Sequence, residues 1–246
     1  MSSPIEIAIN NFVDHCQAIP NSLGSSGTQT PAFSTNQHTL NIPYPHGITV
    51  GDGSNSDTQF NQIRQLLAAR PPNVSTSVVD SYSALDLTPL GFEILFETPW
   101  FYRLEGAAVP SRPVDVARVE SVNTPQQLQE FDRAAAIGFG HPDADVVYST
   151  PLLRDHRYNF YFIRQSNQIV AGVQTFTNEE SLGIYTLFTL LEHRRKGYGS
   201  ALVSHAIGAT GGIPAITNPG DESDQLFRNL GFVHIGTRTI WRRQPD

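Results

Sequence analysis

The segment from Leu187 to Leu202 constrains the fold of this chain more than any other. It starts with an apolar run typical of a buried strand, continues through charged residues at 192–196, and ends in apolar residues at helical spacing. The first N–H groups of a helix lack intrahelical partners and lie at the positive end of the helix dipole. Gly197 and Gly199 would let a ligand approach this backbone without hindrance from a Cβ atom. The segment therefore predicts a strand, an anion-binding turn and a helix.

The charge composition excludes several classes of function. The 246 residues include 16 Lys and Arg against 23 Asp and Glu, a formal net charge of −7. No stretch gathers five or more basic residues, so we expect no nucleic-acid partner. The single cysteine, Cys16, allows neither an intrachain disulfide nor a cysteine-built metal site. No histidine pair has the spacing of a helical zinc site, and we expect no metal.

The hydropathy of the chain predicts neither secretion nor membrane insertion. Residues 1–20 lack the basic region and the continuous apolar core of a signal peptide. No apolar run approaches the ~20 residues of a membrane helix. We therefore expect a soluble, cytoplasmic protein with no membrane partner.

A stretch containing Pro, Ser and Arg at residues 110–113 predicts a boundary between an N-terminal subdomain, 1–110, and a larger domain, 111–246. Residues 20–36 have the composition of a loop. The elements expected in the N-terminal part are helices at 5–16 and 57–70, a strand at 78–79, a helical piece at 84–90 and a strand at 92–103. Those expected in the C-terminal part are a strand at 114–119, a helix capped by Thr124, extended segments at 158–165, 169–177 and 183–191, a helix from about 199, a strand at 214–217, a helix at 221–230 and a strand at 232–242.

One short pattern occurs twice. Leu90-Gly91-Phe92 is followed eight residues later by Trp100, and Leu230-Gly231-Phe232 is followed nine residues later by Trp241. Each copy is typical of a helix end, a glycine cap and a strand that closes on tryptophan. One interpretation is coincidence between two helix-to-strand junctions. The other is that the N-terminal region is a truncated relative of the C-terminal domain, packed against it.

Two motifs resemble hallmarks of the GNAT superfamily of N-acetyltransferases. The first is Arg194-x-x-Gly197-x-Gly199 between an apolar strand and an amphipathic helix, and the second is the helix that ends in Leu230-Gly231-Phe232. The resemblance covers about residues 112–246. It implies an α/β (α+β) fold, in which helices flank a mixed, mostly antiparallel central sheet, with a smaller N-terminal α/β subdomain that is GNAT-like and degenerate.

The resemblance also implies acetyl-CoA as the co-substrate. In this superfamily the strand that corresponds to the one ending at Leu191 separates from its neighbour and pairs with pantetheine. By position, the residues that would contact pantetheine through their backbone are Phe188 and Leu190. Those that would hold the pyrophosphate are Arg195, Lys196, Gly197, Tyr198, Gly199 and Ser200.

The catalytic groups are less clearly marked. Phe227 stands where members of the superfamily commonly carry a tyrosine that protonates the departing thiolate. Tyr185 is a candidate for a relay through water, although an aromatic residue in a strand also suits packing. His141, on the loop after the first helix of the C-terminal domain, is a candidate because that loop usually borders the acceptor pocket. An alkylamine is mostly protonated at neutral pH, so help with deprotonation matters.

We therefore expect an acyltransferase: an acetyl-CoA-dependent N-acetyltransferase in which a small amine or amino-acid-like acceptor attacks the thioester directly. Two alternatives stay open. One is a non-catalytic acyl-CoA-binding module, and the other is transfer of a longer acyl chain. The chain has no nucleophile elbow, P-loop or dinucleotide-binding motif. The oligomeric state is also open, with a homodimer among the alternatives.

Overall fold

The computed structural model describes residues 2–38, 44–71, 73–107, 119–144 and 147–245. The predicted boundary at residue 110 and the first part of the strand predicted at 114–119 lie outside these residues. The chain divides into two compact units, Met1–Trp100 with His234–Asp246, and Phe101–Val233.

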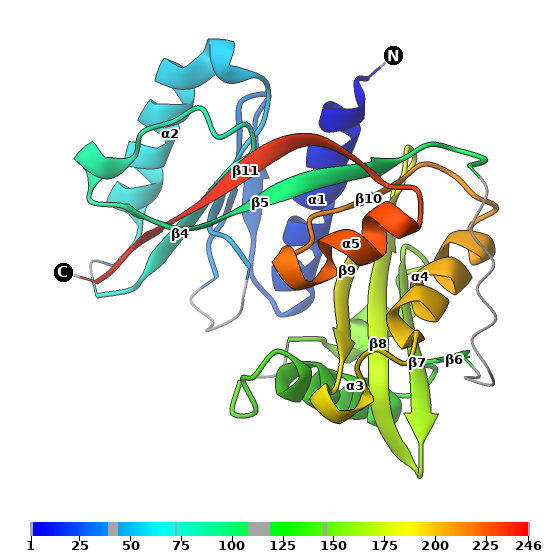
Figure 1. Ribbon diagram of the computed structural model, residues 1–246. Coiled ribbons are helices and arrows are strands. Elements are labelled where there is room, and N and C mark those ends of the chain that lie inside the picture. The colour runs from blue at the N-terminus through cyan, green and yellow to red at the C-terminus, as the bar shows by residue number, and fades with distance from the viewer. Residues whose placement is uncertain (1, 39–43, 72, 108–118, 145–146, 246) are drawn as a thin grey trace. The chain divides into compact units, whose positions relative to one another are not determined.

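The second unit contains the motifs that resemble an acetyltransferase. Its strands and helices, with two short 3₁₀ turns η3 and η4, are β6 (Val119–Ser121), α3 (Pro125–Gly138), η3 (Thr150–Arg154), β7 (Tyr158–Gln165), β8 (Gln168–Thr177), β9 (Leu182–Thr189), η4 (Leu191–His193), α4 (Tyr198–Ala209), β10 (Ala215–Thr217) and α5 (Asp221–Asn229) (Figure 1). Strands β6 to β9 are antiparallel neighbours, and β10 runs parallel to β9. The expected mixed, mostly antiparallel sheet is confirmed.

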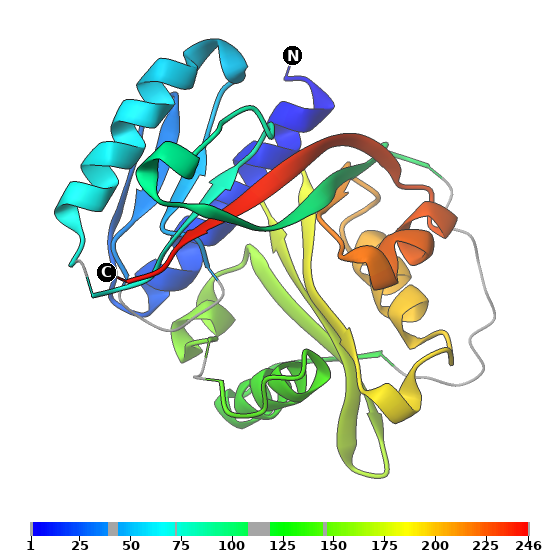
Figure 2. The same cartoon turned by 60° about the vertical axis from the view of Figure 1, so that its left-hand side comes forward.

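Helices cover both faces of this sheet. On one face, α4 and α5 pack on alternate strand residues in a continuous apolar core that includes Val173, Ile184, Leu202 and Phe227. On the other face Phe131 of α3 makes an edge-to-face contact with Phe160 of β7, with 5.4 Å between ring centroids. Figure 2 shows α3 on the opposite side of the strands from α4 and α5.

The first unit contains one part of an eleven-stranded sheet and has its own core. Its elements are α1 (Pro4–Ser22), β1 (Gly27–Gln29), β2 (Phe33–Asn36), β3 (Gly47–Thr49), η1 (Gly53–Asn55), α2 (Ser56–Ala69), β4 (Thr76–Asp80), η2 (Thr88–Leu90), β5 (Glu93–Arg103, up to Trp100) and β11 (Val233–Arg243, from His234). The strand order is β1-β2-β3-β4-β11-β5, and β3 is parallel to β4. The core includes Phe33, Ile63, Val78, Phe92 and Trp241.

Some short elements of the first unit differ from the predictions. Residues 20–36 were expected to form a loop, but α1 extends to Ser22, and β1 and β2 lie between Gly27 and Asn36. The helical piece expected at 84–90 is reduced to the 3₁₀ turn η2. β1 and β2 are short and mostly polar, so their own periodicity does not reveal them and they depend on pairing with other segments.

The N-terminal and C-terminal parts of the chain share one order of elements. In each part, three antiparallel strands (β1–β3 or β7–β9) are followed by a crossover helix, a parallel strand, a short helix or 3₁₀ turn and a long strand, β5 or β11. The repeated pattern also has one geometry: Gly91 and Gly231 have φ values of 78° and 85°. In both, the following Phe donates its N–H to the carbonyl five residues before it, as in a Schellman cap. The structure is therefore consistent with two GNAT-like halves.

Candidate active site

Strand β9 leaves its neighbour β10 near the middle of its length. The parallel pairing consists of Leu182 with Ala215 and Gly183 with Ile216. One more bond follows, from the Thr217 hydroxyl to the Ile184 carbonyl at 3.0 Å. Beyond it, residues 186–189 have no β10 partner within the described part of the chain. The separation implied by the resemblance is therefore present, and it leaves a strand edge that an extended ligand can pair with.

A β-bulge coincides with this separation. Tyr185 lies opposite Gln174 and Phe188 lies opposite Gly172, so two residues of β9 oppose one residue of β8. Thr186, the first of the two, has a φ of 45°. Because a bulge bends its strand and increases the local twist, it redirects β9 at the point where β9 leaves β10.

The turn after β9 forms the expected cradle of backbone amides. Gly197, with a φ of 84°, is the N-cap residue of α4, and no side chain caps the helix. The first amide with a backbone partner is that of Ala201, which donates to the Gly197 carbonyl at 3.0 Å. Within the described residues, the amides of 195–200 make no hydrogen bond. A helix start of this kind binds anions through its N–H groups and its dipole.

Three consecutive basic side chains, at 194–196, lie at or beside the cradle, and the first differs from the other two. Arg194 pairs with Glu222 of α5 at 2.8 Å and donates its Nε–H to the Thr189 carbonyl at 3.2 Å. It therefore ties the turn to α5 and to the end of β9. Arg195 and Lys196 are exposed and have no ion pair among the described residues. Their charges face solvent beside the unpaired amides, where they would add to the attraction for an anion.

Gly199 is favoured by packing against α5. A Cβ atom at this position would lie 2.9 Å from Cδ1 of Leu226 on α5. At Gly197 glycine is favoured for another reason: the backbone has a positive φ, which other residues adopt only with strain. The two glycines of the motif therefore have separate physical reasons.

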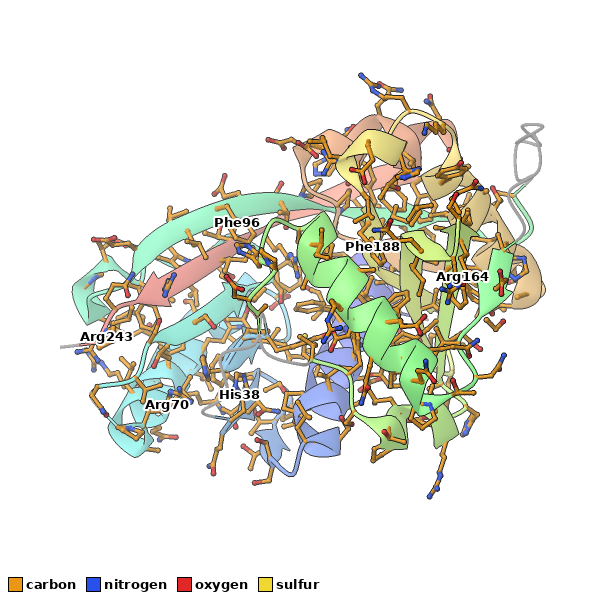
Figure 3. All side chains as sticks on the ribbon, turned by 90° about the horizontal axis from the view of Figure 1, so that it is seen from below. His38, Arg70, Phe96, Arg164, Phe188 and Arg243 are labelled. Carbon is orange, nitrogen blue, oxygen red and sulfur yellow. The ribbon has the colours of Figure 1, made fainter. Side chains whose placement is uncertain are left out.

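Phe188 and Leu190 are both buried, each with 3% of its surface exposed. Phe188 packs near the C-terminal end of α3, where its Cβ would lie 3.0 Å from a Cβ added at Gly138 (Figure 3). Leu190 donates its N–H to Val170 of β8 at 2.9 Å, and its carbonyl accepts the His193 N–H at 2.8 Å. A pantetheine contact through the Leu190 amide would compete with the β8 pairing. The predicted backbone contacts of both residues stay predictions.

The candidate catalytic residues lie in different surroundings. Tyr185 is buried on β9 opposite Gln174, on the sheet face covered by α3. His141 is exposed, in the turn after α3, and its backbone N–H donates to the Ala136 carbonyl at 2.8 Å. Phe227 lies in the apolar core, 2% exposed, with its ring edge-to-face against Phe232. Phe227 therefore contributes packing and no proton.

Sequence reasoning missed three residues beside the bulge. The Tyr148 and Thr186 hydroxyls lie 2.5 Å apart, and the Asp132 carboxylate accepts the backbone N–H of Tyr148. Burial raises the pKa of Asp132, and backbone hydrogen bonds from Val147 and Tyr148 oppose that rise. No local pattern marks these residues, because Tyr148 and Thr186 are 38 positions apart.

The comparisons with known proteins agree with this geometry. Residues 156–234 match the family model described as Acetyltransferase (GNAT) domain. The match covers about a third of the chain, so it is a likeness of this segment to that family's domain. This match supports acyl transfer as the general chemistry of the domain. No curated protein sequence matches the chain.

Solved structures resemble the whole chain in fold. A GCN5-related N-acetyltransferase from Kribbella flavida has 20% identity and a TM-score of 0.67, with 96% of this chain and 95% of that chain covered. A putative GNAT-family acetyltransferase from Novosphingobium aromaticivorans has 13% identity and a TM-score of 0.63, with both chains fully covered. The GCN5-related N-acetyltransferase from Sphaerobacter thermophilus has 12% identity and a TM-score of 0.59, with 98% and 93% covered. At these identities the likeness shows the fold alone.

The described residues contain neither a membrane-spanning helix nor a cluster of metal ligands. No helix among the described residues is long and apolar enough to cross a membrane. Among the same residues, no group of three or more His, Cys, Asp or Glu side chains could hold a metal ion.

Proposed function

We propose that this protein is an acetyl-CoA-dependent N-acetyltransferase that acts on a small amine or amino-acid-like acceptor. The observation that carries the proposal is the amide cradle at 195–200 directly after the strand edge at 186–189. A pyrophosphate suits the cradle, because it is an anion that accepts several hydrogen bonds. An extended chain with amide groups suits the open strand edge. Acetyl-CoA contains both groups in one molecule.

The proposed reaction transfers the acetyl group and moves one proton from the amine to the departing sulfur. The amine nitrogen attacks the thioester carbonyl, an N–C bond forms, the C–S bond breaks, and the proton lost by nitrogen ends on the CoA sulfur. Phe227 cannot donate this proton, because it has no hydroxyl and lies in the core. Tyr185 and His141 remain the candidates for moving it.

Thermal unfolding with acetyl-CoA, CoA and ATP tests the ligand. A ligand at a hundred times its Kd adds about 2.7 kcal/mol of stability, which is a shift of several degrees for a chain of this size. We expect stabilisation by acetyl-CoA and CoA and none by ATP. Equal shifts with ATP would indicate a general anion site, and no shift with any of them would contradict the proposal.

A bulky residue at Gly197 tests the cradle itself. Gly197→Leu places a side chain at the helix start and strains a φ of 84°, so we expect acetyl-CoA no longer to raise the Tm. Gly24→Leu is the matched control, since Gly24 is also exposed, has a φ of 86° and has nothing within 4 Å of an added Cβ. The control should lose similar stability, about 1–2 kcal/mol, and keep the acetyl-CoA shift. Unchanged binding by Gly197→Leu would contradict the assignment.

The buried Phe227 favours one alternative, a module that binds acyl-CoA without turnover. It predicts a Tm shift with CoA and no release of free thiol with any of a broad panel of amines. A single amine that releases thiol in proportion to acetylated product would exclude it. The same assay with longer acyl-CoA donors separates acetyl transfer from transfer of longer chains.

A further inference from the structure

A series of hydrogen bonds joins α3 to the bulge of β9. Asp132, on α3, accepts the backbone N–H groups of Val147 and Tyr148 at 2.7 and 3.2 Å. The side chain of Tyr148 then reaches the sheet, where its hydroxyl lies 2.5 Å from the hydroxyl of Thr186. The series therefore begins on a helix and ends at the residue where β9 bends.

Thr186 adopts a backbone conformation that its side chain disfavours. Its φ is 45°, and a β-branched residue at positive φ is a genuine outlier. Such a conformation costs about 1–3 kcal/mol and persists only where the surroundings hold it. The hydrogen bond between the Tyr148 and Thr186 hydroxyls can hold this conformation, because it fixes the side chain of Thr186.

Tyr148 is itself held in one place. It is 4% exposed, and its ring packs edge-to-face against Phe160 with centroids 4.9 Å apart. The ring of Phe131 on α3 also contacts the Tyr148 ring, with 6.0 Å between the two centroids. With its backbone bound by Asp132 and its ring packed between aromatic neighbours, its hydroxyl is a rigid anchor.

The anchor acts at the point where β9 separates from β10. The last bond between the two strands reaches Ile184, and Thr186 comes two residues later. If Thr186 relaxed to the ordinary β region, the bulge would be lost and the strand would no longer be redirected. The strand edge assigned to pantetheine begins at this residue.

We propose that Tyr148 is a positioning residue for acyl transfer: its hydroxyl holds Thr186 in the left-handed conformation and thereby keeps β9 apart from β10. Asp132 acts through Tyr148 by fixing its backbone. This inference rests on the proposed function, since the separated strand is the place assigned to the acyl donor. Neither Tyr148 nor Asp132 needs to touch the reacting atoms.

Three variants test the anchor. Tyr148→Phe removes only the hydroxyl, and Thr186→Val removes only the partner hydroxyl and keeps the branched side chain. Both should lower kcat about tenfold, as expected for loss of one well-placed hydrogen bond, and faster amide hydrogen exchange should appear at residues 186–189. Thr186→Gly also loses the hydroxyl but adopts positive φ without strain, so its kcat should exceed that of Thr186→Val.

The double variant gives the decisive result. In a Thr186→Gly background, Tyr148→Phe should change kcat and hydrogen exchange by less than about twofold, because the strain to be held is gone. Tyr161→Phe is the matched control. Tyr161 is a buried tyrosine that follows Phe160 on β7, and its ring packs on His205. It should leave both readouts unchanged. Equal losses from Tyr148→Phe in both backgrounds would mean general packing and would overturn the proposal.

The readouts also separate this inference from the proposed function. Hydrogen exchange at 186–189 needs no substrate, so it tests the anchor even if no amine is acetylated. If acetyl-CoA fails to bind the parent protein, the proposed function fails while faster exchange in Tyr148→Phe still supports the anchor. If exchange and kcat are both unaffected by Tyr148→Phe, the anchor is wrong while acyl transfer stands.

Discussion

At the scale of single residues, the glycines of the cradle show how one motif serves two physical needs. Gly197 is required by backbone conformation, with a φ of 84°. Gly199 is favoured by space, since α5 places Leu226 against it. A motif that looks like one ligand-binding signal therefore also encodes the packing of α4 on α5. Substitution can separate the two needs, because each affects a different measurement.

The packing need predicts a specific loss at Gly199. Gly199→Ala would place a Cβ 2.9 Å from Cδ1 of Leu226, and the end of that side chain would have to turn aside, so we expect a loss of about 0.5–1.5 kcal/mol in the free energy of unfolding. Gly208→Ala is the matched control in the same helix, with nothing within 4 Å of an added Cβ, and should be neutral or stabilising. Urea unfolding of the three proteins measures both. Equal effects of the two substitutions would mean that α5 does not constrain Gly199.

Two buried histidines predict that the first unit loses stability in mild acid. Burial lowers the pKa of His15 to about 3. Burial, together with the charges of Arg70 and His38, lowers the pKa of His46 to about 3. His38 stacks on His46 at 4.4 Å. The unfolded chain, with histidine pKa values near 6.5, takes up these protons first as the pH falls. Stability is therefore complete above pH 6.5 and is lost progressively toward pH 3.

The variant His46→Asn measures how much His46 contributes to the loss of stability in acid. At pH 5 each buried histidine should cost about 2 kcal/mol of unfolding free energy relative to pH 7.5. Asparagine retains an acceptor for the Ser77 N–H that His46 Nδ1 accepts at 3.0 Å, so His46→Asn should remove about half of the pH-dependent loss. The exposed His234→Asn should remove none. An unchanged pH dependence in His46→Asn would show that His46 is not the group that titrates.

At the scale of elements, the sequence predicted structure wherever the signal was local. The capping box of α3 is present as expected, with the Thr124 side chain accepting the Gln127 N–H and the Gln127 side chain accepting the Thr124 N–H. The two glycine caps after η2 and α5 are also present. Each of these features depends on residues within one turn of each other. For the same reason the strand, turn and helix of the cradle could be predicted from residues 187–202.

Features that depend on distant pairing could not be predicted. Strands β1 and β2 have three and four residues and exist because they pair with each other and with β3. The bulge at Thr186 depends on the register between β8 and β9, and its contact with Tyr148 depends on how α3 covers the sheet. Sequence patterns report local propensity and amphipathicity, so they leave the register and the long-range contacts of a site undetermined.

At the scale of the whole molecule, the compact units do not follow the linear order of the chain. The last strand, β11, pairs with β4 and belongs to the first unit, from His234 onward. Residues 101–103 at the end of β5 pair with β10 and belong to the second unit. A cut between residues 110 and 111 therefore removes a strand from each unit. The division into 1–110 and 111–246, predicted from the sequence, therefore differs from the compact units, because each half ends in a strand that pairs outside that half.

This exchange predicts that neither half folds alone. Fragment 1–110 lacks β11, one of the two partners of β4, and fragment 111–246 lacks β5, one of the two partners of β10. The chain has two tryptophans, Trp100 in one fragment and Trp241 in the other, and both are buried in the first unit. Each isolated fragment should therefore show the red-shifted fluorescence of exposed tryptophan and no cooperative unfolding.

Mixing or co-expressing the two fragments should restore the blue-shifted emission and a cooperative transition, because each supplies the strand that the other lacks. The intact chain is the reference for both signals. A fragment 111–246 that unfolds cooperatively alone and is stabilised by acetyl-CoA would contradict the prediction. It would show that the acetyltransferase half needs neither β5 nor the pairing of β11 with β4. Restoration only on mixing would show that the exchange of final strands is what makes the two halves one folding unit.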